Sequence, residues 1–202
     1  FLFMENDSVG QYFSNEKLKS NRKQYDTQVL GHHFSFYTDN GVFCKDYLDF
    51  GTRVLLENLP FSELGESVLD VGCGYGVIGI VISKIVGCSV DMIDVNLRAI
   101  HLAKMNAKEN EIDNVHIFES NCYRNVEKKY TSIITNPPIR AGKKVVYEIV
   151  FGAKDHLLED GKLFLVIRKD QGAKSLINDL QKLYNVEVLK RDKGFFVIKC
   201  SL

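Results

Sequence analysis

A glycine-rich turn between an apolar run and a helical pattern is the segment best suited to bind a ligand. Residues 68–79 read VLDVGCGYGVIG and contain four glycines. Glycine lets the backbone turn sharply and lets a ligand lie directly against it, and the helix that follows presents free N–H groups. We therefore predict a small-molecule site here; a merely tight turn, which needs fewer glycines, is the alternative.

Two kinds of ligand fit this turn. Gly74, Gly76 and Gly79 match the dinucleotide pattern G-x-G-x-x-G, and Asp94 lies twenty residues beyond Gly74, as that pattern requires. The carboxylate of Asp70, just before the glycines, instead favours a cationic ligand, because it would repel a pyrophosphate. S-adenosylmethionine has a sulfonium and an ammonium and no phosphate. Asp94 suits a ribose diol in both cases, so these residues leave both ligands open.

An Asn-Pro-Pro turn is the second segment whose residues could take part in a reaction. Asn136, Pro137 and Pro138 follow a short apolar run, and they include two of the three prolines in the chain. Prolines stiffen the turn and leave its carbonyls free to accept, and the residue before a proline is held extended. The Asn136 amide oxygen and the Pro137 carbonyl would then hold both hydrogens of a planar –NH₂ group and direct its lone pair at an electrophile. A purely structural loop is the alternative.

Alternating strands and helices must bring the two turns together. Such alternation predicts an α/β fold with a doubly wound, mostly parallel sheet, whose carboxyl edge binds ligands. The last two strands are joined by a short turn at 192–194, so they must be antiparallel. The expected strands are 67–71, 89–95, 115–118, 132–135, 162–168, 186–190 and 195–200, and the expected helices are 77–85, 97–109, 145–156 and 173–183.

The 202 residues predict one domain with a short N-terminal extension. We expect an extended or loosely ordered arm over residues 1–30 and a single domain over 31–202. Within that domain, 33–37 predicts a further strand and 47–58 a further helix.

Composition excludes several classes of protein. The formal net charge is zero, so bulk charge gives no argument for binding nucleic acid or membranes. No apolar stretch approaches the length of a membrane span. The five cysteines show no C-x-x-C spacing and predict reduced thiols in a cytoplasmic protein, and the histidine spacing predicts no metal site.

The two turns together, DVGCGYG at 70–76 and NPPI at 136–139, resemble class I S-adenosylmethionine-dependent methyltransferases that act on amino groups. From about Tyr12 onward the chain is similar to the small-methyltransferase-domain family, notably at 41–52 and 168–173. That family includes enzymes that methylate the 2-amino group of guanine in small-subunit ribosomal RNA. The resemblance implies a Rossmann-like sheet of seven strands, S-adenosylmethionine as cofactor, and ribosomal RNA or the small ribosomal subunit as partner.

The resemblance also implies roles for single residues. Gly72, Cys73 and Gly74 would approach the methionine part of the cofactor, and Asp94 would hold its ribose. Asn121 stands where many relatives carry an Asp against the adenine amine, and Phe43 and Asp49 would close over the cofactor. The predicted catalytic residues are Asn136, Pro137, Pro138 and Ile139, and the predicted cofactor-binding residues are Phe43, Asp49, Asp70, Gly72, Cys73, Gly74, Asp94, Val95, Asn121, Cys122 and Asn136.

One departure from the family bears on the substrate. Ile139 stands where many amino-methylating relatives have an aromatic residue that stacks on the target base, so base capture must depend on other groups. We predict that Arg140 and Lys143 hold a substrate phosphate. The cations at 168–169 and 190–193 are expected to be solvated surface.

The function predicted from the sequence is therefore methylation of an exocyclic amino group of a nucleobase, guanine in small-subunit ribosomal RNA. Methylation of the adenine 6-amino group or of a protein glutamine amide is an alternative within the same class. An NAD(P)-dependent oxidoreductase and a non-catalytic RNA-binding module are the alternatives from other classes.

Overall fold

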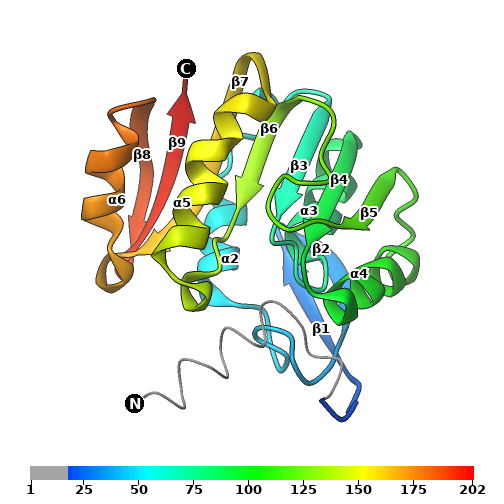
Figure 1. Ribbon diagram of the computed structural model, residues 1–202. Coiled ribbons are helices and arrows are strands. Elements are labelled where there is room, and N and C mark those ends of the chain that lie inside the picture. The colour runs from blue at the N-terminus through cyan, green and yellow to red at the C-terminus, as the bar shows by residue number, and fades with distance from the viewer. Residues whose placement is uncertain (1–17) are drawn as a thin grey trace.

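A seven-stranded sheet with helices on both faces dominates the computed structural model, which describes residues 18–202 (Figure 1). The strand order is β5-β4-β3-β6-β7-β9-β8, and β9 runs antiparallel to the other six strands of this sheet. The strands are β3 (Ser67–Val71), β4 (Ser89–Asp94), β5 (Val115–Glu119), β6 (Tyr130–Thr135), β7 (Leu157–Arg168), β8 (Asn185–Asp192) and β9 (Phe195–Ser201). The predicted α/β architecture, with its last strand antiparallel, is confirmed.

Within residues 18–202, five α-helices cover the two faces of the sheet. They are α2 (Phe50–Glu57), α3 (Val77–Val86), α4 (Leu97–Glu109), α5 (Lys143–Gly152) and α6 (Ala173–Leu180), with short 3₁₀ turns at Phe61–Glu63, Ile139–Ala141, Ala153–His156 and Lys169–Gln171. Successive strand residues point to opposite faces, so they enter separate cores. Val68 packs with α2, α3 and α4, whereas its neighbour Leu69 packs with α5 and α6.

A β-hairpin lies against this body and corrects one expectation. β1 (Lys23–Val29) pairs antiparallel with β2 (His32–Thr38), so residues 23–29 are an ordered strand and not a loose arm. The side chains of residues 23–29 alternate in exposure, and only Val29 is fully buried. Because most of these residues are polar, the sequence did not predict a strand here. The expected boundary at residue 30 falls in the turn of this hairpin, and the division into arm and domain stays a prediction. The start of the resemblance, at Tyr12, lies outside the described residues.

The hairpin is tied to the glycine-rich turn by a buried asparagine. Asn106 of α4 accepts a hydrogen bond from the Tyr37 amide at 2.7 Å, and its own Nδ2 donates to the Tyr75 carbonyl at 2.7 Å. The hydroxyls of Tyr25 and Tyr75 lie 2.6 Å apart. The hairpin therefore supports the turn from the side of α4.

The element boundaries differ from the expected ones mainly where tertiary pairing extends an element. β7 begins at Leu157, five residues earlier than expected, because Leu157 pairs with Tyr130 of β6. The helix expected over 145–156 ends at Gly152 and continues as a 3₁₀ turn. None of the helices in residues 18–202 has the length and apolar character needed to cross a membrane.

Candidate active site at the carboxyl edge of the sheet

The two predicted turns meet at the carboxyl edge of the sheet. β3 lies between β4 and β6, so Gly72, Asp94 and Asn136 end or follow three neighbouring strands (Figure 1). A Cβ built on Gly72 would lie 4.0 Å from the Pro138 ring, which places the glycine turn beside the Asn-Pro-Pro turn. Thr135 fixes this contact, because its hydroxyl donates to the Val71 carbonyl at 2.8 Å. The structure thus brings together the two motifs that the sequence singled out.

The four glycines form two pairs with different structural roles. Gly72 and Gly74 have positive φ angles of 69° and 55°, and a Cβ on Gly74 would meet nothing within 4 Å. Gly76 and Gly79 instead face packed side chains, and a Cβ on Gly79 would lie 2.6 Å from the sulfur of Met92. The first pair therefore leaves backbone open to a ligand, and the second lets α3 pack closely on the sheet.

Asp94 ties the glycine turn to the start of α4. Its Oδ2 accepts a hydrogen bond from the Gly74 amide at 2.8 Å, and its Oδ1 accepts one from the Asn96 amide at 2.9 Å. Burial raises the pKa of this carboxyl, and the amide hydrogen bonds act against that rise. The Val95 amide also donates to this carboxylate, so about one of its four lone-pair positions remains to accept from a hydroxyl.

Asp70 is buried beneath the turn and does not reach its open side. The residue is fully buried, and its Oδ2 accepts from the Gly79 amide in the first turn of α3 at 2.9 Å. Its Oδ1 is buried and has no hydrogen-bond partner. Burial, together with the nearby charge of Asp94, raises the pKa of Asp70 to about 7. With no exposed surface, Asp70 supports the turn through Gly79, and its predicted contact with the cofactor stays a prediction.

The raised pKa of Asp70 predicts a pH-dependent stability. The unfolded carboxyl has a pKa near 3.8, so between pH 3.8 and about 7 the native state binds more protons than the unfolded state. Stability should therefore fall as pH rises through this window, by a few kcal/mol, because each pKa unit is worth about 1.4 kcal/mol. Asp70→Asn should remove this component. Urea unfolding of both proteins at about pH 4 and about pH 8 measures it, and identical pH slopes would contradict the assignment.

Asn136 is held by two side chains of the segment that begins α2. Its Nδ2 donates to Asp49 Oδ2 at 3.1 Å and to Thr52 Oγ1 at 3.0 Å. Asp49 is itself fixed as the N-cap of α2, where it accepts from the Thr52 amide at 2.9 Å. Because both donor contacts fall on the amide nitrogen, the Asn136 Oδ1 is the atom left to accept from a substrate.

The proline carbonyl is less free than expected. The Pro137 oxygen accepts a hydrogen bond from the Ile139 amide at 2.9 Å, which corrects the expectation of an unoccupied acceptor. The φ and ψ of Pro138, −76° and 81°, are those of an inverse γ-turn, which makes this bond. A carbonyl has two lone pairs, so one remains for an amine hydrogen.

The predicted phosphate-binding residues follow this turn. Arg140 is exposed in the 3₁₀ turn Ile139–Ala141. Lys143 begins α5, with its ammonium 5.0 Å from the centre of the Tyr147 ring. Ile139 is half-buried and packs against the core on the α5 face. All three stay predictions for substrate contact.

The other predicted cofactor residues surround the turn at different depths. Phe43 is 61% exposed on the loop before α2, whereas Cys73 and Cys122 are buried. Burial raises the pKa of both thiols, to about 11 for Cys122, so neither is a thiolate nucleophile at neutral pH. Val95 and Asn121 are half-buried and follow β4 and β5 at the same edge.

Thr52 and Tyr75 contribute to the site without having been predicted. Thr52 lies in the helix expected over 47–58, and its contact with Asn136 spans 84 residues, which spacing cannot reveal. Tyr75 lies between two glycines of the turn, and its hydroxyl donates to the Cys44 carbonyl at 3.0 Å and so ties the turn to the loop before α2.

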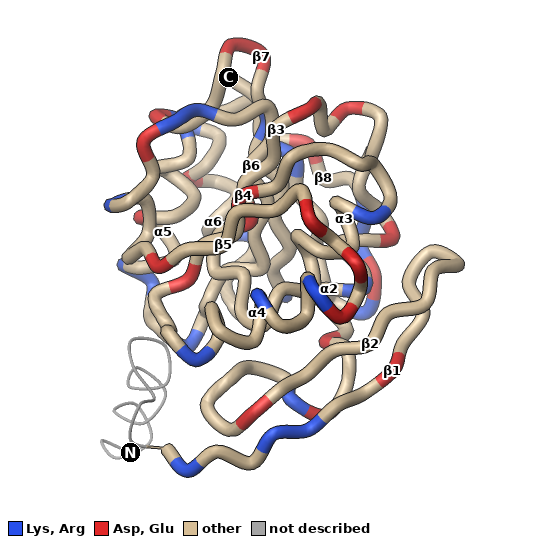
Figure 2. The backbone as a smooth tube through the Cα atoms, turned by 90° about the vertical axis from the view of Figure 1, so that its right-hand side faces the viewer, with Lys and Arg blue, Asp and Glu red and all other residues tan. Residues whose placement is uncertain are grey.

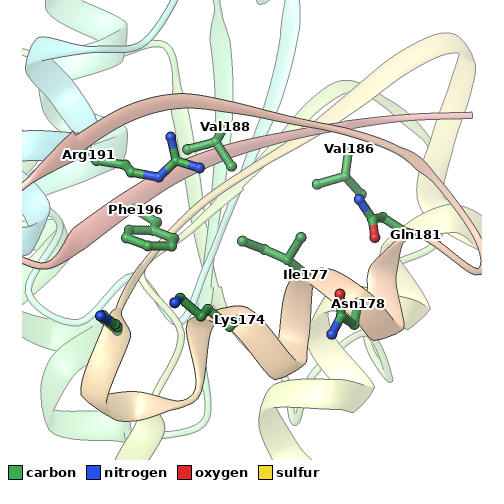
Figure 3. Close-up of a pocket in the computed structure, with 9 residues that line it drawn as sticks. Lys174, Ile177, Asn178, Gln181, Val186, Val188, Arg191 and Phe196 are labelled. Carbon is green, nitrogen blue, oxygen red and sulfur yellow. The ribbon is translucent and has the colours of Figure 1, made fainter.

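An open groove of about 690 Å³ lies on another part of the surface. It is bounded by α6 and by the β8–β9 hairpin, and its lining includes Ile177, Val188 and Phe196 and the cations Lys174 and Arg191 (Figure 3). A smaller hollow of about 270 Å³ is lined by residues of the 41–47 loop. The larger groove does not include any residue of the Asn-Pro-Pro or glycine turns, so volume alone does not locate the site.

Comparison with known families identifies the family of the chain. The family model described as "Methyltransferase small domain" matches residues 33–199. The chain belongs to this family. The predicted membership among S-adenosylmethionine-dependent methyltransferases of the small-domain family is therefore confirmed, and with it the cofactor expected for that family.

Individual relatives agree with this family. The chain is 42% identical over 199 residues to the uncharacterized protein YbxB of Bacillus subtilis (strain 168), covering 96% of this chain and 99% of that protein. It is 33% identical to ribosomal RNA small subunit methyltransferase C of Psychromonas ingrahamii, over 79% of this chain and 46% of the relative.

A solved structure shows the same fold. The 16S rRNA N2 G1207 methyltransferase (RsmC) of T. thermophilus, in complex with AdoMet and guanosine, superposes with a TM-score of 0.81 at 23% identity. It covers 91% of this chain and 51% of that chain. This chain therefore spans about half the length of the ribosomal RNA methyltransferases that it matches.

Proposed function

We propose that this chain binds S-adenosylmethionine over the Gly72–Gly74 backbone and transfers its methyl group to an exocyclic amino group of a nucleobase, the 2-amino group of guanine in small-subunit ribosomal RNA. The observation that carries the proposal is the Asn136 amide, whose nitrogen is held by Asp49 and Thr52 beside the glycine turn. The similarity of the chain to ribosomal RNA methyltransferases supports RNA as substrate.

The residues present suit this cofactor. The open backbone at Gly72 and Gly74 admits a ligand, and the acceptor atoms of Asp94 suit ribose hydroxyls. No phosphate-binding group is required, which fits the two buried carboxylates, Asp70 and Asp94, under and beside the turn. Family membership also speaks against the oxidoreductase alternative.

The chemistry assigned to the protein is positioning. When bound, S-adenosylmethionine supplies an electrophilic methyl carbon on a sulfonium. Asn136 Oδ1 accepts one amine hydrogen and the remaining lone pair of Pro137 O accepts the other, so the nitrogen becomes more tetrahedral and its lone pair is directed at that carbon. As the N–C bond forms and the C–S bond breaks, the amine's positive charge develops against these two oxygens, and its surplus proton then leaves to solvent.

Nucleoside mass spectrometry tests the proposed function. Ribosomal RNA from cells without the gene should lack one methylated guanine, and the wild-type gene should restore it whereas the Asn136→Ala gene should not. Loss of a methylated adenine, or of a methylated glutamine in a protein, would assign the alternative substrates. RNA binding with no methyl transfer would assign the non-catalytic module.

The contact between Asp49 and Asn136 predicts a positioning effect. Asp49→Ala should lower kcat on the order of 10-fold, because a loosened amide no longer presents Oδ1 to the amine. Asp49→Asn retains an acceptor for Asn136 Nδ2 and should recover much of this loss. The affinity for S-adenosylmethionine, measured by calorimetry, should change little in either variant. A weakened affinity with unchanged kcat would instead support the cofactor-closing role that the resemblance implies for Asp49.

A further inference from the structure

Two aromatic rings form a surface at the carboxyl edge of the sheet, outside the predicted site. Phe50 begins α2 and Phe195 begins β9, and their ring centres lie 5.6 Å apart at an angle of 63°. Phe50 is 36% exposed, and Phe195 is half-buried. Both rings therefore have part of their surface accessible to solvent.

The aromatic pair adjoins the Asn136 amide through α2. Phe195 packs directly on Gly51, since a Cβ at that glycine would lie 2.7 Å from the ring. Gly51 stands between Asp49 and Thr52, the two residues that hold Asn136. A strand of nucleotides that placed its target base at Asn136 would therefore meet these rings within a residue or two of that base.

Two cations accompany the rings. The Arg168 guanidinium lies 5.8 Å from the centre of Phe195, and the Lys193 ammonium lies 5.2 Å from the centre of Phe50. Arg168 is paired with Asp170, and the backbone amide of Lys169 donates to the Gly194 carbonyl at 2.7 Å, which fixes the end of β7 to the β8–β9 turn. Both cations are exposed, and both are held near an aromatic ring.

We propose that Phe50, Phe195, Arg168 and Lys193 form a binding surface for an unpaired RNA strand next to the target base, an inference that rests on the proposed function. Single-stranded RNA is bound by aromatic rings and guanidinium planes that stack on bases and by cations that hold phosphates, and this surface offers both. It also supplies what Ile139 lacks, an aromatic contact beside Asn136. Lys/Arg and Asp/Glu are interspersed along the rest of the described backbone (Figure 2), and the net charge is zero, so affinity for RNA must come from local surfaces such as this one.

Binding of a guanine-containing single-stranded RNA of roughly ten nucleotides, followed by fluorescence anisotropy, tests the surface. Phe50→Leu should weaken binding by about 10-fold, whereas Phe50→Trp, which keeps a stacking face, should bind as the wild type does. Lys193→Ala should reduce the slope of log affinity against log salt by about one, as expected for a lost phosphate contact. Lys154→Ala is the matched control, because Lys154 is exposed at the opposite edge of the sheet, before β7.

The outcomes separate this surface from the proposed reaction. If the protein binds the RNA, the variants weaken binding as stated, and no methyl transfer is found, the surface stands and the proposed function fails. If the wild type does not bind the RNA at low salt, or if Phe50→Leu and Lys193→Ala match it in affinity and in KM for RNA, the surface is wrong. In that case Phe50 and Phe195 serve only to pack α2 on β9.

Discussion

Replacing Asn136 by alanine is expected to lower kcat by roughly 100- to 1000-fold, the range found when a preorganised polar group is removed from a transition state. The amine would lose the acceptor that directs its lone pair, and Pro137 O alone would remain. The affinity for S-adenosylmethionine should stay nearly unchanged, because the open glycine backbone and Asp94 are untouched. Methyl transfer from labelled cofactor to RNA, together with calorimetry of cofactor binding, measures both quantities.

Asn136→Asp is a sharper test of the role assigned to the Asn136 amide. A carboxylate at this position cannot donate to Asp49, whose Oδ2 lies 3.1 Å from the amide nitrogen that it would replace. Two carboxylates at that distance repel each other, so this variant should be at least as slow as Asn136→Ala despite keeping an acceptor oxygen. Wild-type turnover in either variant would show that Asn136 does not act on the amine.

The carboxyl-edge site was predictable from the sequence because its two motifs are local. The residues of each turn lie within a few positions of one another, and both turns follow apolar runs that must be buried parallel strands. Neighbouring parallel strands end at the same edge, so the meeting of the two turns there followed from topology, whereas the position of Gly72 beside Pro138 comes from the structure alone. The antiparallel β9 followed equally from a connection at 192–194 that is too short for a crossover.

The features that escaped prediction depend on contacts between distant segments. Asp49 meets Asn136 across 87 residues, and Ser35 of the hairpin meets Asn110 of α4 across 75. β1 carries mainly polar residues and is ordered by pairing with β2, so its sequence shows little apolar alternation although its side chains alternate in exposure. The partial occupation of the Pro137 carbonyl is likewise a matter of backbone angles at Pro138, which proline fixes only in φ.

The glycine turn and α2 are coupled more closely than separate motifs would imply. Tyr75, inside the turn, donates to the Cys44 carbonyl in the loop that leads to α2, and Asp49 at the start of α2 holds Asn136. One connected set of contacts thus runs from the glycine turn to the Asn-Pro-Pro turn. A change in the 41–49 loop is therefore expected to affect both turns, whereas a change in the α6 groove should affect neither.

Replacing Asp94 by alanine is expected to weaken the affinity for S-adenosylmethionine by about 100-fold, the cost of removing hydrogen bonds to a charged acceptor. The variant removes the acceptors proposed for the ribose hydroxyls and also the hydrogen bonds that Asp94 accepts from the Gly74 and Asn96 amides. Asp94→Asn preserves the volume and one acceptor, so its loss should be smaller, and thermal unfolding of both variants separates misfolding from lost contacts. Asn121→Asp, which restores the acid that many relatives carry, should move the affinity in the opposite direction. Unchanged affinity in a folded Asp94→Ala protein would exclude Asp94 from the cofactor site and confine it to bracing the turn.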